Sequence, residues 1–194
     1  WNGTESRSLV VLFFSPPPRS STAMPNAQEV IATLGLQLHP IEGGFFRETF
    51  RSSGVIPSRS LPPGYHDGRD RSIGTAIYYL LTRDTFSELH RLPTEEVFHF
   101  YLGGPVRMLQ IFPDGKARDI IIGTDICAGQ QPQVVVPAGV WQGSRLEPGG
   151  HDFALLGATV TPGFDYADYE QGKRADLIAL FPNQAERIRE LTRV

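Results

Sequence analysis

Short runs in which apolar and polar residues alternate fill the middle of the chain and predict β-strands. Turn signals such as Pro113-Asp114-Gly115 separate these runs, because proline fixes φ and glycine supplies a positive φ. No strand–helix alternation and no long repeat is visible. Many short strands joined by Gly/Pro turns indicate a sandwich, a jelly roll or a small barrel. The predicted strands are 45–52, 75–81, 87–92, 97–102, 106–112, 117–122, 133–137, 140–145 and 153–160.

Helices are predicted only at the two ends of this β region. Asn26 can cap a short helix that runs to Leu34 and stops at Gly35. The tail is helical over 175–180, breaks at Pro182 and resumes over 184–191. We therefore expect one domain over 24–194, with a barrel core at 37–171 and a helical tail at 172–194. The loop 54–71 has the length of a lid or a disordered segment.

Residues 1–23 form a Ser/Pro-rich extension that holds one apolar run, Leu9 to Phe14. The run is short for a signal peptide and precedes three prolines, so we interpret it as an extra edge strand that pairs with another subunit.

Composition excludes several classes of function. The 194 residues carry a net charge of only −3 and no long basic run, which disfavours nucleic acid. No apolar stretch is long enough to cross a membrane. Cys127 is the single cysteine, so intramolecular disulfides are impossible and we expect a cytoplasmic protein. Cys127 has no basic neighbour and is not a credible nucleophile.

The stretch from Ser87 to Gly104 carries the candidate chemistry. Strand alternation places Glu96, Phe98 and Phe100 inside the barrel and His99 outside, where a structural role is expected. A neutral His90 beside Glu96 can act as a general base near physiological pH. We therefore predict His90 and Glu96 as catalytic residues.

The spacing of His90, Glu96 and Gly103 resembles the first motif of the cupin superfamily, in which His-x-His is followed by Glu and then Gly. The segment Pro137-Ala138-Gly139-Val140-Trp141-Gln142 resembles the second motif, Pro-x-Gly-x-x-His. The resemblance implies a divalent metal ion held at one point of the barrel. Leu92 and Gln142 stand where two of the motif histidines are expected. The remaining candidate ligands are His90, Glu96 and Gln142.

Five segments in order also resemble the DUF985, or Cupin_5, family. This resemblance implies an all-β cupin fold, the double-stranded β-helix or jelly roll, with a short N-terminal helix and C-terminal helices. It also implies a homodimer and a pocket for a small-molecule ligand. The segments are LGLQLHPIEGGFFRETFRSS, TAIYYLL, HRLPTEEVFHFYLGGP, VVVPAGVWQGSRL and TVTPGFDYADYE.

For the remaining pocket residues, strand alternation alone does not decide which side chains face the cavity. Alternation does not decide between Arg47 and Glu48 or between Tyr78 and Tyr79; Glu48 and Tyr78 are taken as ligand-binding. Gln142 and the aromatic residues Phe98, Phe100 and Trp141 complete that set, since aromatic walls hold flat or sugar-like ligands. The segment 162–169 is either a turn that clamps the C-terminal helices or a source of an orienting carboxylate, Asp165.

The leading functional hypothesis is an isomerase- or epimerase-like enzyme that transfers a proton on a small polar metabolite, carbohydrate-like or cyclic. An incomplete metal triad favours acid–base chemistry. The alternatives are a divalent-metal-dependent oxygenase and a non-catalytic small-molecule-binding module.

Overall fold

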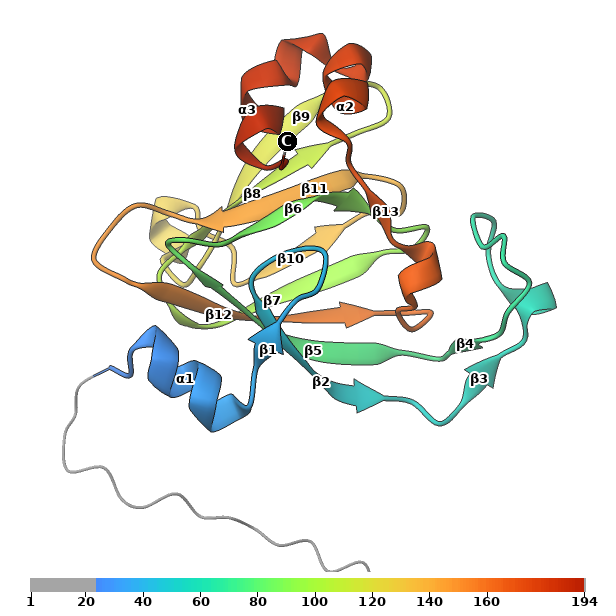
Figure 1. Ribbon diagram of the computed structural model, residues 1–194, viewed down its shortest axis with the longest axis horizontal. Helices are drawn as coiled ribbons and strands as arrows, with labels where there is room; N and C mark the ends of the chain where they lie inside the picture. Colours follow the sequence, from blue (N-terminus) through green and yellow to red (C-terminus); the bar gives the residue numbers. More distant parts are fainter. Residues whose placement is uncertain (1–23, 194) are drawn as a thin grey trace, which may run out of the picture.

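A computed structural model describes residues 24–193, which fold as two antiparallel sheets that face each other (Figure 1). The core between them takes residues from both sheets, among them Phe98 and Leu156 from one and Met108 and Leu146 from the other. This is the predicted all-β jelly roll. The apolar run Leu9 to Phe14 lies outside the described residues.

The two sheets are built from strands that are distant in sequence. The larger sheet has the order β1 (Gln37–Leu38), β2 (Phe45–Arg51), β5 (Thr75–Thr82), β12 (Phe153–Val160), β7 (Glu96–Gly103) and β10 (Gln133–Val136). The smaller has the order β13 (Glu170–Gln171), β6 (Phe86–Arg91), β11 (Trp141–Leu146), β8 (Val106–Ile111) and β9 (Ala117–Ile122).

The loop 54–71, expected as a lid or a disordered segment, has structure of its own. Strands β3 (Val55–Ile56) and β4 (Arg71–Ser72) pair there and flank a 3-10 turn. The Arg71 guanidinium is 2% exposed and binds Asp168 at 2.7 and 2.6 Å and Asp67 at 3.0 Å. This ion-pair cluster ties the loop to the segment that precedes β13.

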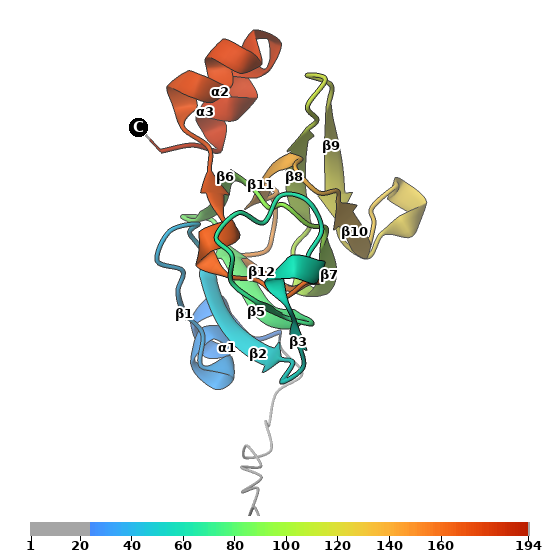
Figure 2. The same ribbon diagram turned by 90° about the vertical axis from the view of Figure 1, so that its right-hand side faces the viewer.

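The helices cover the outer faces of the two sheets, on opposite sides of the barrel (Figure 2). Helix α1 (Ala27–Leu34) begins at Asn26, whose side chain accepts from the backbone of Glu29, and ends at Gly35 in the left-handed conformation, as predicted. It packs on the larger sheet through Val30 and Leu80. Helices α2 (Arg174–Leu180) and α3 (Ala185–Glu190) pack on the smaller sheet.

Strand pairing has three register shifts in the described residues, and two of them lie next to the predicted site residues Glu48 and Gln142. In β2 the register shifts between Glu48 and Phe50. A β-bulge at this point turns Phe50 outward, where it is 56% exposed. Strict alternation would place Phe50 on the same face as Phe46 and Glu48. In β11 the register shifts between Gln142 and Ser144, and a Cβ on Gly143 would lie 2.9 Å from the backbone oxygen of Ser87.

The segment after α3 returns to the edge of β6. The backbone N–H of Leu89 donates to the carbonyl of Leu191 at 2.8 Å. Arg193 then binds the buried Glu88 carboxylate through its backbone N–H at 3.0 Å and through Nη1 at 2.6 Å. Nη1 also donates to the carbonyl of Ile41 at 2.7 Å. The C-terminal segment therefore braces both β6 and the loop before β2.

Candidate functional site

A cavity of about 210 Å³ opens between the two sheets at the start of β7. Its apolar wall comes from Phe46, Ile77, Leu92, Ala158 and Val160. Its polar groups come from four separate segments of the chain. They are His39, Glu42, Glu48, Arg51, Thr75, His90, Glu96, Asp165 and Tyr166. An apolar enclosure with a few converging polar groups is the usual form of a small-molecule site.

His90 lies on β6, directly opposite Gln142 of β11, and is 2% exposed. Its Nδ1 lies 2.7 Å from the carbonyl oxygen of Glu88. Because a carbonyl can only accept, Nδ1 carries the proton and Nε2 of the neutral ring holds the lone pair. The ring stacks on Tyr169 with centroids 4.8 Å apart. These contacts fix both the orientation and the tautomer of a potential base.

Glu96 is the first residue of β7 and is 8% exposed. Burial, with a further contribution from the nearby Glu42 carboxylate, raises the pKa of Glu96 well above its usual value of 4.5. The side chain is therefore poised as a neutral carboxylic acid. Such a group can donate a proton near neutral pH.

Gln142 joins the two groups through a single amide nitrogen. Its Nε2 lies 2.7 Å from His90 Nε2 and donates to Glu96 Oε2 at 2.8 Å. The amide oxygen is buried and has no hydrogen-bond partner within the described part of the chain. The amide therefore holds the base and the acid at a fixed separation and prevents direct proton exchange between them.

The three metal ligands predicted from the spacing, His90, Glu96 and Gln142, do lie together, but hydrogen-bond donors rather than lone pairs occupy the space between them. The N–H groups of Gln142 point at both His90 and Glu96, so hydrogens lie between the atoms that would have to ligate. Leu92 puts an apolar side chain where the cupin motif has a histidine. Across residues 24–193 no group of three or more His, Cys, Asp or Glu side chains could hold a metal ion. The donor set does not fit a metal site.

The sequence analysis missed several polar residues of the cavity, of which His39 and Glu42 lie nearest the predicted pair. His39 and Glu42 lie on the loop between β1 and β2, where no periodicity marks them, although both stand in the first segment of the family resemblance. Glu42 Oε1 accepts from the Ser87 hydroxyl at 2.5 Å, and Oε2 lies 3.9 Å from His90 Nε2. Burial lowers the pKa of His39, opposed in part by Glu42 and assisted by His90.

The cavity entrance is polar and partly formed by the segment 162–169. Arg51 binds Glu48 through two bonds of 3.0 and 2.7 Å and also donates to the carbonyl of Phe164 at 3.1 Å. Asp165 and Tyr166 line the same opening. Within the described residues, Asp165 accepts hydrogen bonds from Ala167 and Arg69 and none from a histidine, so the contacts do not support the alternative of an orienting carboxylate. Glu48 faces the cavity and Arg47 does not, in agreement with the prediction of Glu48 as the ligand-binding residue.

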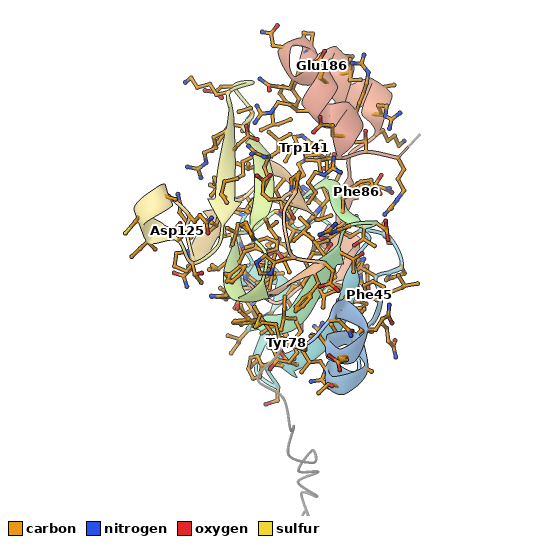
Figure 3. All side chains as sticks on the ribbon, turned by 90° about the vertical axis from the view of Figure 1, so that its left-hand side faces the viewer. Phe45, Tyr78, Phe86, Asp125, Trp141 and Glu186 are labelled. Atoms are coloured by element: carbon orange, nitrogen blue, oxygen red, sulfur yellow. The ribbon has the colours of Figure 1, made fainter. Side chains whose placement is uncertain are left out.

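The structure places four of the predicted ligand-binding aromatic residues outside this cavity. Phe98 and Phe100 point inward, as predicted, but they pack in the core. Tyr78 packs on the outer face of the larger sheet, near α1. Trp141 lies beneath the C-terminal helices with Leu177 (Figure 3). Trp141 precedes the inward Gln142, and adjacent strand residues face opposite sides, so the two could not both line the cavity.

His99 and Cys127 lie away from the cavity. The His99 ring faces outward, as alternation predicts, and bonds Thr159 and Gln133, each at 3.2 Å. Cys127 is exposed in a 3-10 turn. Among the described residues, no helix has the length and apolarity that crossing a bilayer requires.

Comparison with known proteins agrees with the fold. The chain is 31% identical over 172 residues to the uncharacterized protein YML079W of Saccharomyces cerevisiae, covering 85% of this chain and 81% of the relative. A solved hypothetical protein from Leishmania major superposes with a TM-score of 0.78 at 29% identity, covering 88% of this chain and all of that one. A solved protein from Shewanella oneidensis gives 0.76 at 32% identity, covering 88% and 99%.

The family model described as "Cupin superfamily (DUF985)" matches residues 28–172, which include every polar residue of the cavity. The resemblance inferred from the five sequence segments is thereby confirmed. The chain belongs to the Cupin_5 (DUF985) family of the cupin superfamily.

Proposed function

We propose that the cavity binds a small polar metabolite and catalyses a proton transfer on it, as in an isomerisation or epimerisation. The observation that carries the proposal is the pairing of a neutral imidazole with a buried carboxyl group in one small cavity. His90 offers a lone pair on Nε2 and Glu96 offers an acidic proton. An imidazole beside a carboxyl group whose pKa is raised by burial is typical of acid–base sites.

In the proposed reaction, His90 Nε2 removes a proton from a substrate carbon next to a carbonyl group. Glu96 donates its proton to the carbonyl oxygen, which gives an enol and leaves an imidazolium and a carboxylate. The His90 imidazolium then returns a proton either to the neighbouring carbon, where the substrate carries an adjacent hydroxyl and the intermediate is an enediol, or to the original carbon after the enol has turned over in the cavity. Glu96 recovers its proton from the hydroxyl that becomes the carbonyl group, so both residues end in their starting states. Gln142 loses its bond to His90 during the first step and retains the one to Glu96, which then accepts as a carboxylate.

The proposal is tested by incubating the protein with a metabolite library in deuterated water and measuring mass gain. We expect one compound to gain deuterium, with the gain abolished by His90→Ala and by Glu96→Gln. Glu95→Gln is the matched control, because Glu95 is the exposed neighbour of Glu96. If a compound binds in the cavity but neither exchanges a proton nor is converted, the result would contradict the enzyme and favour a non-catalytic binding module.

The oxygenase alternative has its own test. Protein purified without chelators should contain far less than one equivalent of iron, manganese, nickel or zinc, with no gain on adding these ions. Stoichiometric metal that is lost in His90→Ala would overturn the acid–base proposal and favour the oxygenase.

The homodimer stays a prediction. If the run Leu9 to Phe14 crosses between subunits, removing residues 1–23 should weaken the dimer in sedimentation. An unchanged profile after truncation would reject that role for the run.

A further inference from the structure

The polar end of the cavity is bordered by aromatic rings. The His39 ring lies edge-on to Phe46 with centroids 4.6 Å apart, and its centroid is 6.1 Å from that of Tyr166. Tyr166 in turn meets Phe164 at 5.2 Å. All four residues line the cavity. The faces of aromatic rings attract cations, and grouped rings are a common way to bind an ammonium group.

The charges that line the cavity are predominantly negative. Glu42, Glu48, Glu96 and Asp165 face a single arginine, Arg51. That arginine is committed to both oxygens of Glu48. Asp165 is bound by Arg69 at 3.1 Å from outside the lining, and burial raises the pKa of Glu96 and so disfavours its charge. Glu42 is the carboxylate that remains.

Glu42 has no cationic partner within residues 24–193, although its side chain is only 13% exposed. The one basic side chain within 4 Å of its oxygens is His90, at 3.9 Å. Its two ring nitrogens are engaged elsewhere, Nδ1 with the Glu88 carbonyl and Nε2 with the Gln142 amide nitrogen, each at 2.7 Å. His39 is held neutral, because its Nδ1 accepts the backbone N–H of Glu42 at 2.9 Å and burial lowers its pKa. A largely buried carboxylate of this kind is costly unless a cation pairs with it.

We propose that the ligand is a small organic ammonium ion whose protonated amine pairs with the Glu42 carboxylate among the rings of His39, Phe46 and Tyr166. The inference rests on the proposed function in one respect, which is that this cavity is the ligand site. It adds that the polar metabolite is an amine. Phosphorylated sugars and other anionic metabolites are rejected, because the lining offers them no free cation.

Three ring compounds of the same shape and different charge test the inference. Cyclohexylamine is cationic at neutral pH, cyclohexanol is neutral and cyclohexanecarboxylate is anionic. We expect titration calorimetry to rank their affinities in that order. The cation should bind about ten- to a hundredfold more tightly than the alcohol, the range of one charge-assisted hydrogen bond.

The variant Glu42→Gln keeps the shape of the side chain and removes its charge. We expect it to abolish the preference for cyclohexylamine and to leave the affinity for cyclohexanol within about twofold. Glu95→Gln removes a carboxylate outside the cavity and should preserve the whole ranking. The affinity ranking of the three compounds is measured on the unmodified protein, so it still tests the inference if Glu42→Gln does not fold.

Tighter binding of the carboxylate or the alcohol than of the amine would overturn the inference, as would a preference for the amine that survives in Glu42→Gln. Binding of none of the three compounds would overturn it too. These results are separate from deuterium exchange. A neutral substrate that exchanges would refute the ammonium ligand alone, whereas an amine that binds without exchange would refute proton transfer alone.

Discussion

Replacing Arg193 with methionine should destabilise the protein far more than its position near the chain end suggests. Arg193 supplies the cation that faces Glu88, a carboxylate with a side chain that is 2% exposed. Methionine preserves most of the apolar stem, and the change removes the guanidinium, which pairs with Glu88 and lies 5.3 Å from the centroid of the Phe86 ring. It leaves Glu88 with the backbone N–H of residue 193, at 3.0 Å, and no opposite charge.

The expected loss is about 1–3 kcal/mol in the free energy of unfolding. Removing one partner of a fully buried ion pair costs about 3–5 kcal/mol, because the other charge is left uncompensated. The Arg193 side chain is 49% exposed, so solvent screens the pair and water can partly replace the lost group. The lower range reflects that screening and the backbone bond that survives.

Urea unfolding of a double-mutant cycle gives the measurement. Glu88→Gln combined with Arg193→Met removes the buried charge together with its partner, and should be less destabilised than Arg193→Met alone. Arg189→Met is the control, since Arg189 is exposed on α3, and should shift stability by less than about 0.5 kcal/mol. The reasoning fails if Arg193→Met matches that control, or if the double variant recovers nothing.

Three shorter predictions concern the cavity and its supports. The folded-state pKa of Glu96 is raised above 4.5, so ionisation of this group destabilises the folded protein as the pH rises above that value. Glu96→Gln cannot ionise, and its stability relative to the unmodified protein should therefore grow between about pH 4 and 8 in urea titrations. Gly43→Ala should cost about 1–3 kcal/mol in the same assay, because Gly43 has φ 98° and an added Cβ would lie 2.4 Å from the Phe86 carbonyl oxygen. Phe50→Ser should change stability by less than about 0.5 kcal/mol, whereas the loss of an inward phenylalanine would cost about 3–5 kcal/mol by thermal or urea unfolding.

The sequence was sufficient for the barrel and for the centre of the site. Alternating runs marked the main strands, because one face of each strand is buried and the other is not. The spacing from His90 to Glu96 placed both in one cavity, since a hairpin of fixed length aims their side chains at the same point. Gln142 followed from the second motif for the same reason. These features depend on local geometry that a single strand or hairpin determines.

The parts that were missed depend on contacts between distant segments. His39 and Glu42 sit on a loop, where no period distinguishes an inward side chain from a solvated one. Tyr169 reaches His90 because β13 pairs with β6, across a long separation in sequence. Trp141 was misassigned for a different reason. Large aromatic residues suit a pocket wall and a helix contact equally well, and the helices that cover Trp141 come from the far end of the chain.

The bulge in β2 makes the chemistry of the entrance sensitive to the register of this strand. Glu48 and Arg51 are three positions apart, yet both line the cavity, because the extra residue shifts the alternation between them. Without the bulge, a regular ladder would turn Phe50 to the face of Glu48 and Arg51 away from it, which would exchange an ion pair for a phenylalanine at the opening. Substitutions that favour or remove the bulge would thus offer related proteins a short evolutionary route between polar and apolar ligands, with the base and acid on β6 and β7 left in place.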